Sequence, residues 1–568
     1  MIQTKKFLPE LFILSALYLC SLVIVFEKKV TIITLVYIFL LLLFYRHFLK
    51  DTNKIIRFKY FEKLSIYIFL VFLFAITYLL QNYFLNYETI TWDVPSYLVA
   101  SQEIGRGNLP LETQWESKGP LLLYIYYFIT KLADKNYIIF RLINDIFIAG
   151  SASLIFFNIY KKSNKNMAIS SIASVIFLLI TSHEWYVSEF SEIYCLFLLG
   201  IIYYIFNFDN LSKSKYILIG FLFSLLTLIN QGTVVFLVPY LIAILKIKDS
   251  KKVFKNYLYM FLGFSLPHLF FIYLYFINDL INIYISNYFT IPLEYTNSNA
   301  SSFYELSVIL RRFFQFEQFL YYSIVGILIF SAIQFIKSLR HKYLLNILDI
   351  DYLNVLAALA FYFIAGHNYA HHLYYFIFFI PFLILKLNYS QVRILCCFVF
   401  ISFFTILLKL GPTSVDNLTN INNLYENYPL KNLALEIENN FISDFDILAL
   451  DYVLVLFYLD VPNVSYIIHP GNHYEDFIVE ELLRLEKLQT NEFSHISYYI
   501  ELEPDVIMCN PTYVISGEAK KRDFYNCAVD DYKKNYLKLE TKKFKNNKNL
   551  HLYNNPYESI DVYLKKSE

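Results

Sequence analysis

Charged side chains gather in one polar stretch, residues 91–120, that lies between strongly apolar segments. Asp93 directly follows an apolar segment and stands beside Trp92. A carboxylate at the edge of a low-dielectric slab is expected to have a raised pKa, as a general base needs. Lys118 precedes a Gly-Pro turn, where a helix start presents positive dipole and free N–H groups to an anion. A carboxylate base and a phosphate-binding cation at one interface suit transfer from a lipid phosphate to a hydroxyl.

Both residues also have ordinary explanations. A single interfacial aspartate is often a solvated helix cap, and a lysine near a membrane often only snorkels toward water. Asp93 and Lys118 occur in the same short loop, on the same side of the predicted membrane. This shared position favours a functional site over two unrelated caps.

The elements that must position this loop are membrane helices. The chain has 568 residues, of which 57% are hydrophobic and 17% are charged, whereas soluble domains carry about 25% charged residues. Apolar runs close to the ~20 residues that cross a bilayer recur through the first 410 positions. The net charge of +1 indicates no nucleic-acid partner. We therefore expect a mainly α, polytopic helical membrane protein.

The apolar pattern predicts 13 membrane-spanning helices. They cover residues 7–26, 30–46, 64–83, 138–159, 168–183, 189–207, 215–230, 233–247, 257–278, 318–336, 352–366, 373–387 and 392–409. The first run is long and lacks a small-residue cleavage site, so we interpret it as a membrane anchor. A further apolar stretch, 121–133, is too short to span and follows Pro120, which favours a helix lying along the interface.

Lysine and arginine in the short connections predict the orientation. The basic connections are 46–63, 161–165, 213–215, 246–252 and 337–342. With the predicted helices, all of them fall on one side, which we assign to the cytoplasm together with the N-terminus. The opposite, outward side then receives the loops 84–137, 183–189, 279–317 and 366–372. We expect the protein in the bacterial plasma (inner) membrane.

The chain divides into three parts. Residues 1–60 hold two N-terminal transmembrane helices, 61–410 form the main membrane domain with its first outer loop at 84–137, and 411–568 form an extracytoplasmic domain. This last part alternates short apolar runs with one amphipathic stretch, which is typical of a small α/β domain. The runs are 446–451, 464–469 and 505–510, and the helical stretch is 475–488.

The C-terminal domain lacks a Gly-rich phosphate loop and a metal-ligand cluster at usable spacing. We therefore expect it to shape the site from outside without taking part in the chemistry. Its residues 542–555 favour a solvated hairpin. Cys509 and Cys527 lie in this domain as a possible disulfide pair, although two cysteines make a weak framework.

The outer loop carries a family resemblance. The stretch "WDVPSYLVASQEIGRGNLPLETQWESKGPLLLY" resembles the first outer loop of GT-C superfamily glycosyltransferases. It is especially similar to bacterial relatives of protein O-mannosyltransferases and of the lipid A aminoarabinose transferase. The residues that match in order and spacing are Asp93, Tyr97, Gly107, Pro110, Glu116, Lys118, Gly119 and Pro120. Weaker similarities at 141–157, 188–199 and 366–381 extend the resemblance over about residues 64–410.

The resemblance implies a GT-C type membrane domain that transfers a sugar from a polyprenyl-phosphate donor to a hydroxyl of a cell-envelope glycan, lipid or protein. It implies that Asp93 acts as the base in an inverting displacement and that Lys118 contacts the donor phosphate. Val94 stands where the family usually has a second acid. This departure puts a metal requirement in doubt: a divalent metal is possible as a cofactor but unsupported, and we assign no metal-binding residues.

Other polar residues are weaker candidates for the same site. As further phosphate-binding residues we expect Arg311, Arg312 and His372, and as acceptor-binding or lining residues Tyr97, Glu116, Glu192 and His371. Each has a structural alternative: Glu116 as a salt-bridge partner of Lys118, Glu192 as a stabiliser of a helix end, and the arginines as anchors of the next helix. His371 and His372 suggest a metal, but the sequence identifies no third ligand.

Asp145 lies inside a predicted span, where a charge costs roughly 2.5–3.5 kcal/mol on insertion scales. It must therefore face protein or water, and we expect a structural pair with Arg141. Two other functions remain open. A polysaccharide polymerase or ligase also uses lipid-linked glycans, and a transporter or flippase would show internal repeats and mid-membrane ionisable groups. No clear repeat is visible, and the acids cluster in one outer loop, which favours the transferase.

Overall fold

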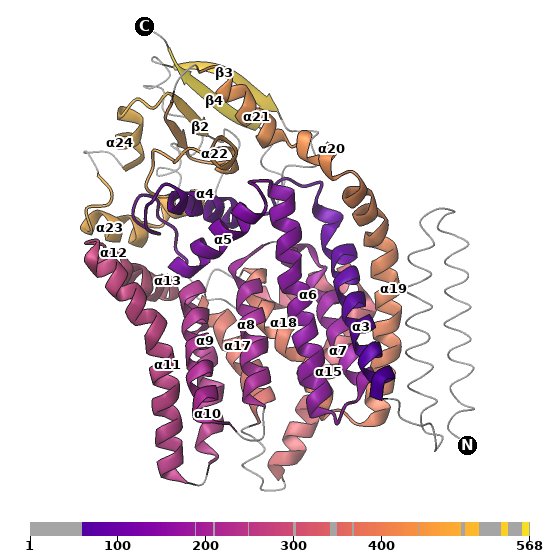
Figure 1. The fold of residues 1–568 in the computed structure, drawn as a ribbon. Helices are drawn as coiled ribbons and strands as arrows, with labels where there is room; N and C mark the ends of the chain where they lie inside the picture. The colour runs from indigo at the N-terminus through magenta and orange to yellow at the C-terminus, as the bar shows by residue number, and fades with distance from the viewer. Residues whose placement is uncertain are drawn as a thin grey trace.

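The computed structural model describes residues 59–187, 189–207, 211–247, 249–298, 303–340, 349–365, 369–441, 444–489, 495–509, 536–543 and 559–566. These residues form a long helical bundle with a smaller α/β unit at one end (Figure 1). The predicted helices 7–26 and 30–46 lie outside the described residues.

The predicted spans from residue 64 onward are helices. They are α3 (Lys59–Gln81), α6 (Tyr137–Lys162), α7 (Met167–Thr181), α8 (Ser191–Phe206), α9 (Lys213–Ile229), α10 (Leu237–Leu245), α11 (Ser250–Ile277), α15 (Gln318–Arg340), α17 (Ile350–Ala365), α18 (Tyr374–Phe379) and α19 (Tyr389–Thr419). In the described chain, five helices are long and apolar enough to cross a membrane: Lys63–Phe84, Tyr137–Lys162, Ser250–Ile277, Gln318–Ser338 and Tyr389–Thr419. Helix α19 extends past the domain boundary predicted at 411.

Large apolar side chains on α11 point away from the rest of the bundle. Phe254, Phe261 and Phe276 are each more than 60% exposed, which suits a surface that faces lipid rather than water. The opposite face of α11 packs closely on α9. A Cβ built on Gly220 would lie 1.9 Å from the carbonyl oxygen of Met260, so the small residue lets the two backbones approach.

The first outer loop contains two helices at the end of the bundle that carries the α/β unit, α4 (Asp93–Gly105) and α5 (Pro120–Leu132) (Figure 1). Helix α5 confirms the helix expected after Pro120. The Gly119 N–H donates to the Ile229 carbonyl at the end of α9, over 3.2 Å. A Cβ on Gly119 would lie 2.1 Å from the Leu228 carbonyl oxygen, so only glycine allows this approach. The start of α5 is thereby held against the end of α9.

The α/β unit contains a sheet of order β1-β2-β4-β3. Its strands are β1 (Ile447–Ala449), β2 (Val506–Cys509), β3 (Tyr536–Lys543) and β4 (Ser559–Lys565), and its helices are α21 (Pro429–Glu438), α22 (Leu454–Leu459), α23 (Asp476–Arg484) and α24 (His495–Glu501). Strands β1 and β2 are parallel, and the other two pairings are antiparallel. The predicted strands at 446–451 and 505–510 and the helix at 475–488 are confirmed. Cys527 and most of 542–555 lie outside the described residues.

The predicted strand at 464–469 begins against the sheet, where the Val464 N–H donates to the Ile447 carbonyl of β1 over 2.9 Å, but it is not one of the four strands. Ile467 instead forms a parallel bridge with Trp115 of the outer loop. Trp115 N–H donates to the Tyr466 carbonyl at 2.7 Å, and Ile468 N–H donates to the Trp115 carbonyl at 3.4 Å. This extended segment therefore joins the α/β unit to the membrane part of the chain.

The expected pairing of Asp145 with Arg141 is also wrong. Arg141 Nε lies 3.1 Å from Glu189 Oε1, and both side chains are buried. Asp145 Oδ2 instead accepts a 2.6 Å hydrogen bond from the Asn82 side chain. Asp145 lies one turn further along α6 than Arg141, so it meets the end of α3 while Arg141 meets the segment before α8. Each buried charge thus has a polar partner.

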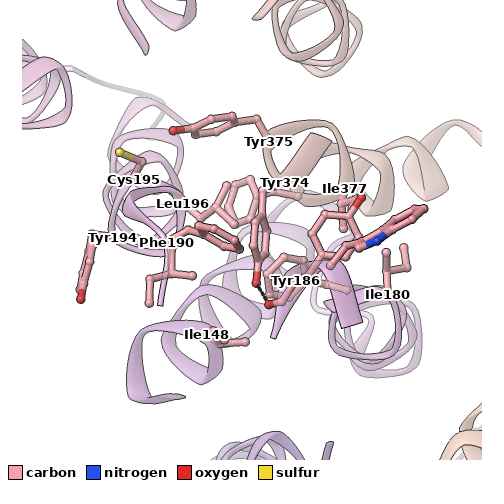
Figure 2. Packing of buried hydrophobic residues seen from close by; sticks show 14 of the residues in the cluster. Ile148, Ile180, Tyr186, Phe190, Tyr194, Cys195, Leu196, Tyr374, Tyr375 and Ile377 are labelled. Atoms are coloured by element: carbon pink, nitrogen blue, oxygen red, sulfur yellow. Dashed lines mark hydrogen bonds between the residues drawn. The ribbon is translucent and has the colours of Figure 1, made fainter. Parts of the chain in front are cut away.

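An aromatic cluster packs where α6, α7, α8 and α18 meet (Figure 2). Tyr186, Phe190 and Tyr374 are almost fully buried, and the Tyr374 hydroxyl donates to the Tyr186 carbonyl (Figure 2). Phe190 immediately precedes α8, so this packing fixes the start of α8 against α18.

Candidate active site

Asp93 forms a close pair with a histidine from the α/β unit. Its Oδ1 lies 3.0 Å from Nε2 of His469. His469 Nδ1 accepts a hydrogen bond from the Gly471 N–H over 3.1 Å. Because Nδ1 is occupied as an acceptor, a neutral His469 carries its proton on Nε2 and donates it toward Asp93. Asp93 is the first residue of α4, where the helix dipole also favours a carboxylate.

The extended segment described above brings His469 to this position. It is fixed along its length, since the Gln114 side chain donates to the Asn463 carbonyl at 3.0 Å. His469 and Asp93 are 376 residues apart in the chain. His469 is not among the residues predicted from the sequence, because a histidine before Pro-Gly carries no distinguishing signal and the α/β unit was expected to supply no chemical group.

The sequence predicts a raised pKa for Asp93, but in the structure this pKa is lowered. Burial by itself raises the pKa, but the hydrogen bond from His469 and the positive charges of His469, His371 and Lys118 outweigh it and hold the pKa below its ordinary value. Burial lowers the pKa of His469, and the hydrogen bond and charge of Asp93 outweigh it, so that the pKa is raised. The Asp93 side chain keeps 25% exposure. Asp93 is therefore an ionised carboxylate at neutral pH.

Two further residues of the outer loop lie close to this pair. Glu116 is buried, and its Oε1 accepts hydrogen bonds from the Ser117 N–H and hydroxyl at 2.7 and 2.9 Å. Its Oε2 is buried without a hydrogen-bond partner among the described residues. Burial raises the pKa of Glu116, while the charge of His469 opposes this. Tyr97 lies one turn after Asp93, and burial together with the charges of Asp93, Glu116 and Glu192 holds its hydroxyl pKa well above 10.

Hydrogen bonds hold the backbone of Lys118 in place and leave its ammonium group for other partners. The Lys118 carbonyl accepts a 3.1 Å hydrogen bond from the Asn287 side chain, and the neighbouring Ser117 carbonyl accepts one from Gln231 at 3.1 Å. The charge of Lys118 acts on both Asp93 and His371. In the part of the chain that the structure describes, no salt bridge joins Lys118 to a carboxylate, including Glu116. The geometry offers this cation to an anionic ligand.

A second cluster of polar side chains lies beside this pair. Glu192, in the first turn of α8, and the consecutive His371 and His372, in the short helix η7 (Ala370–Leu373), each bring one potential ligand atom within 4.8 Å of the others. Burial lowers the pKa of His371, whereas the charges of Glu192 and Asp93 raise it, with a net lowering. His371 therefore lies within electrostatic range of Asp93.

Solved structures identify the architecture in which this site lies. The ArnT of Cupriavidus metallidurans bound to undecaprenyl phosphate matches this chain with a TM-score of 0.55, over 88% of this chain and 97% of ArnT, at 9% sequence identity. Its apo structure matches with a TM-score of 0.54 at the same coverage and identity. The chain has the GT-C fold. No protein-family model matches the sequence, and a search of curated proteins gives no match.

The GT-C fold brings together most of the residues predicted from the sequence. Asp93, Tyr97, Glu116 and Lys118 come from the first outer loop, Glu192 from α8, and His371 and His372 from the connection before α18. Arg311 and Arg312 lie elsewhere, on the exposed face of helix α14 (Phe303–Phe316) rather than in a loop. The Arg312 guanidinium lies over the Trp185 ring, 5.2 Å from its centre. No contact joins either arginine to Asp93 or Lys118 within the described residues.

Proposed function

We propose that this GT-C protein transfers a sugar from a polyprenyl-phosphate donor to a hydroxyl of a cell-envelope acceptor. The observation that carries the proposal is the Asp93–His469 pair beside the Lys118 ammonium, in a fold that ArnT shares and that was solved for ArnT with undecaprenyl phosphate. A carboxylate held by a histidine and a neighbouring cation match the two charges that such a reaction must handle.

Asp93 would act as the base through its second oxygen. Oδ1 is held by His469, and Oδ2 has no hydrogen-bond partner among the described residues. The acceptor hydroxyl oxygen would attack the anomeric carbon while its proton passes to Asp93. The bond between that carbon and the donor phosphate oxygen breaks, and its electron pair leaves with the lipid phosphate. One displacement inverts the anomeric carbon, and the phosphate leaves without an acid because it is a good leaving group.

Lys118 would bind the donor phosphate. Its backbone is fixed by Asn287 and by the contact of Gly119 with Ile229, so the flexible side chain extends from an anchored position. The positive end of the α5 dipole, which begins at Pro120, adds to the attraction for a phosphate. Glu116, whose Oε2 is buried without a hydrogen-bond partner among the described residues, and Tyr97, whose hydroxyl is within electrostatic range of Asp93 and Glu116, would contact the acceptor. No geometry supports Arg311 or Arg312 in this role.

The site end of the bundle would face outward, with the N-terminus in the cytoplasm. A two-sided arrangement is supported by the fold, because α4, α5 and the α/β unit gather at one end of the bundle, while the end of α6 and the starts of α9 and α11, which carry lysines, lie at the other (Figure 1). Positive charge favours the cytoplasmic side. An outward site suits a lipid-linked donor, since nucleotide sugars are confined to the cytoplasm.

The test is consumption of labelled polyprenyl-phosphate sugars by purified membranes, comparing the wild type with Asp93→Asn. This substitution keeps the shape of the side chain and removes the base, so we expect the rate to fall by about 100-fold or more. Asp134→Asn is the matched control, because Asp134 is an exposed residue of the same loop whose backbone conformation asparagine tolerates.

Equal rates for Asp93→Asn and the wild type would refute the role of Asp93. If the wild-type membranes consume no monophosphate donor but elongate a diphosphate-linked glycan, the polymerase or ligase function replaces the transferase.

A further inference from the structure

The Glu192, His371 and His372 side chains form a compact group of three potential metal ligands. Their ligand atoms lie within 4.8 Å of one another. We propose that these three residues bind one divalent metal ion, with Zn²⁺ as the preferred ion. Two imidazoles and one carboxylate are a frequent ligand set of zinc sites that keep an open coordination position.

The carboxylate ligand is held in place by neighbours other than the histidines. Glu192 Oε2 accepts from the Ser191 hydroxyl at 3.1 Å, and Oε1 accepts from the Asn230 amide at 3.3 Å. Such outer contacts orient a metal-binding carboxylate and are a regular feature of metal sites. Because the charge of Glu192 is supported from behind, its oxygens are presented to the two imidazole rings.

The imidazole rings are held by aromatic packing. His371 stacks on Phe190 with ring centres 4.3 Å apart and lies parallel to Tyr369 at 5.4 Å. The His371 and His372 rings meet edge to face, with centres 4.6 Å apart. His372 is itself 5% exposed and meets the Phe361 ring at 90°. Fixed rings lose little conformational entropy on metal binding.

The spacing requires only a small closure of the side chains. Bond lengths of about 2.0–2.1 Å and tetrahedral angles put the ligand atoms of a zinc site about 3.3 Å apart. The observed limit of 4.8 Å therefore leaves at most ~1.5 Å for the ligand atoms to close, which small torsional changes of the three side chains supply.

The position of the cluster indicates what the metal would do. Glu192 accepts from Asn230, the residue after Ile229, and the Ile229 carbonyl accepts from the Gly119 N–H beside Lys118, so the ion would lie close to the residue assigned to the donor phosphate. Its open position would take a phosphate oxygen of the donor, and this last step rests on the proposed function. The metal site itself does not depend on that function.

The test measures metal binding to the purified full-length protein in detergent, with Zn²⁺ and Co²⁺ as the probes. We expect about one Zn²⁺ per wild-type chain after dialysis, and a loss of affinity of 100-fold or more in Glu192→Gln and in His372→Gln. Glu184→Gln and His268→Gln are the matched controls, because Glu184 is an exposed residue and His268 a half-buried one, both outside the cluster, and they should keep the metal. Size-exclusion profiles of the metal-free proteins verify that each variant is folded.

A ligand substitution gives a signature that a structural role cannot produce. In His372→Cys loaded with Co²⁺, a thiolate-to-cobalt charge-transfer band should appear that the cobalt-loaded wild type lacks. Absence of bound metal in the wild type, or unchanged affinity in well-folded Glu192→Gln and His372→Gln, would overturn the site.

Sugar transfer measured in parallel separates this proposal from the proposed function. Metal binding without any transfer supports the metal site and refutes the function. Transfer by a wild type that binds no metal supports the function and overturns the metal site.

Discussion

The contact between Asp93 and His469 yields the sharpest test of how the α/β unit takes part in the site. We consider His469→Ala, which removes both the hydrogen bond and the positive charge, and His469→Gln, whose amide still donates a hydrogen bond. In the wild type the carboxylate is oriented by a 3.0 Å contact to Nε2, and its pKa is held below the ordinary value.

The expected magnitudes follow from the strength of that contact. A hydrogen bond to a charged group contributes about 1.5–3 kcal/mol. At about 1.4 kcal/mol per tenfold change in rate, loss of the orientation in His469→Ala should lower kcat/KM about 10- to 100-fold. The same energy corresponds to an upward shift of the Asp93 pKa by about one to two units, because burial is then opposed only by His371 and Lys118.

The assay is kcat/KM for sugar transfer as a function of pH. The base must be ionised, so activity falls on the acid side, and this acid limb should move to higher pH in both variants. His469→Gln should recover much of the rate at neutral pH while it keeps the shifted limb, because the amide orients the carboxylate without a charge. His268→Ala, a half-buried histidine on α11, is the control for loss of an imidazole.

An unshifted acid limb in a folded His469→Ala protein would refute the electrostatic reasoning, and an unchanged rate would refute the positioning role. Stability gives a second readout. Because the pKa of Asp93 is lowered, its ionised form stabilises the fold fully above pH 3.8, the ordinary pKa of an aspartate. Because the pKa of His469 is raised, its protonated form stabilises the fold fully below pH 6.5, the ordinary pKa of a histidine. The stability difference between the wild type and His469→Ala should therefore be largest between these two pH values and shrink on either side.

Three other predictions follow from single contacts. Lys118→Gln should lower kcat/KM for the lipid donor by about 10- to 100-fold, since a charge-assisted phosphate contact is worth about 1.5–3 kcal/mol. Lys118→Arg should recover part of this loss. Kinetics equal to those of the wild type would show that Lys118 does not bind the donor. Gly119→Ala should lower the Tm, because its Cβ would meet the Leu228 carbonyl oxygen, whereas an unchanged Tm would mean that the backbones separate freely. Burial raises the pKa of Glu88 to about 8, although the N–H groups of Leu430 and Lys431 oppose it. The native state then binds the proton more tightly than the unfolded chain, so stability falls as pH rises from 4.5 toward 8, and Glu88→Gln should flatten this slope in Tm measured against pH.

The local sequence was sufficient for the helices of the bundle. A run of about 20 apolar residues has few alternatives in a membrane, because each backbone N–H and C=O must be paired within the segment. The helix after Pro120 and the strands β1 and β2 were also predictable, since they depend on neighbouring residues. The grouping of Asp93 with Tyr97, Glu116 and Lys118 followed from their place in one loop.

The partners of these residues were decided only by the tertiary structure. His469 reaches Asp93 because the segment before it contacts β1 at Asn463 and then pairs with Trp115 of the outer loop. Glu192 joins His371 and His372 because α8 packs against α18, and this supplies the third ligand that the sequence lacked. Contacts between segments far apart in the chain depend on packing geometry, which no local pattern encodes, and the lowered pKa of Asp93 is a consequence of those contacts.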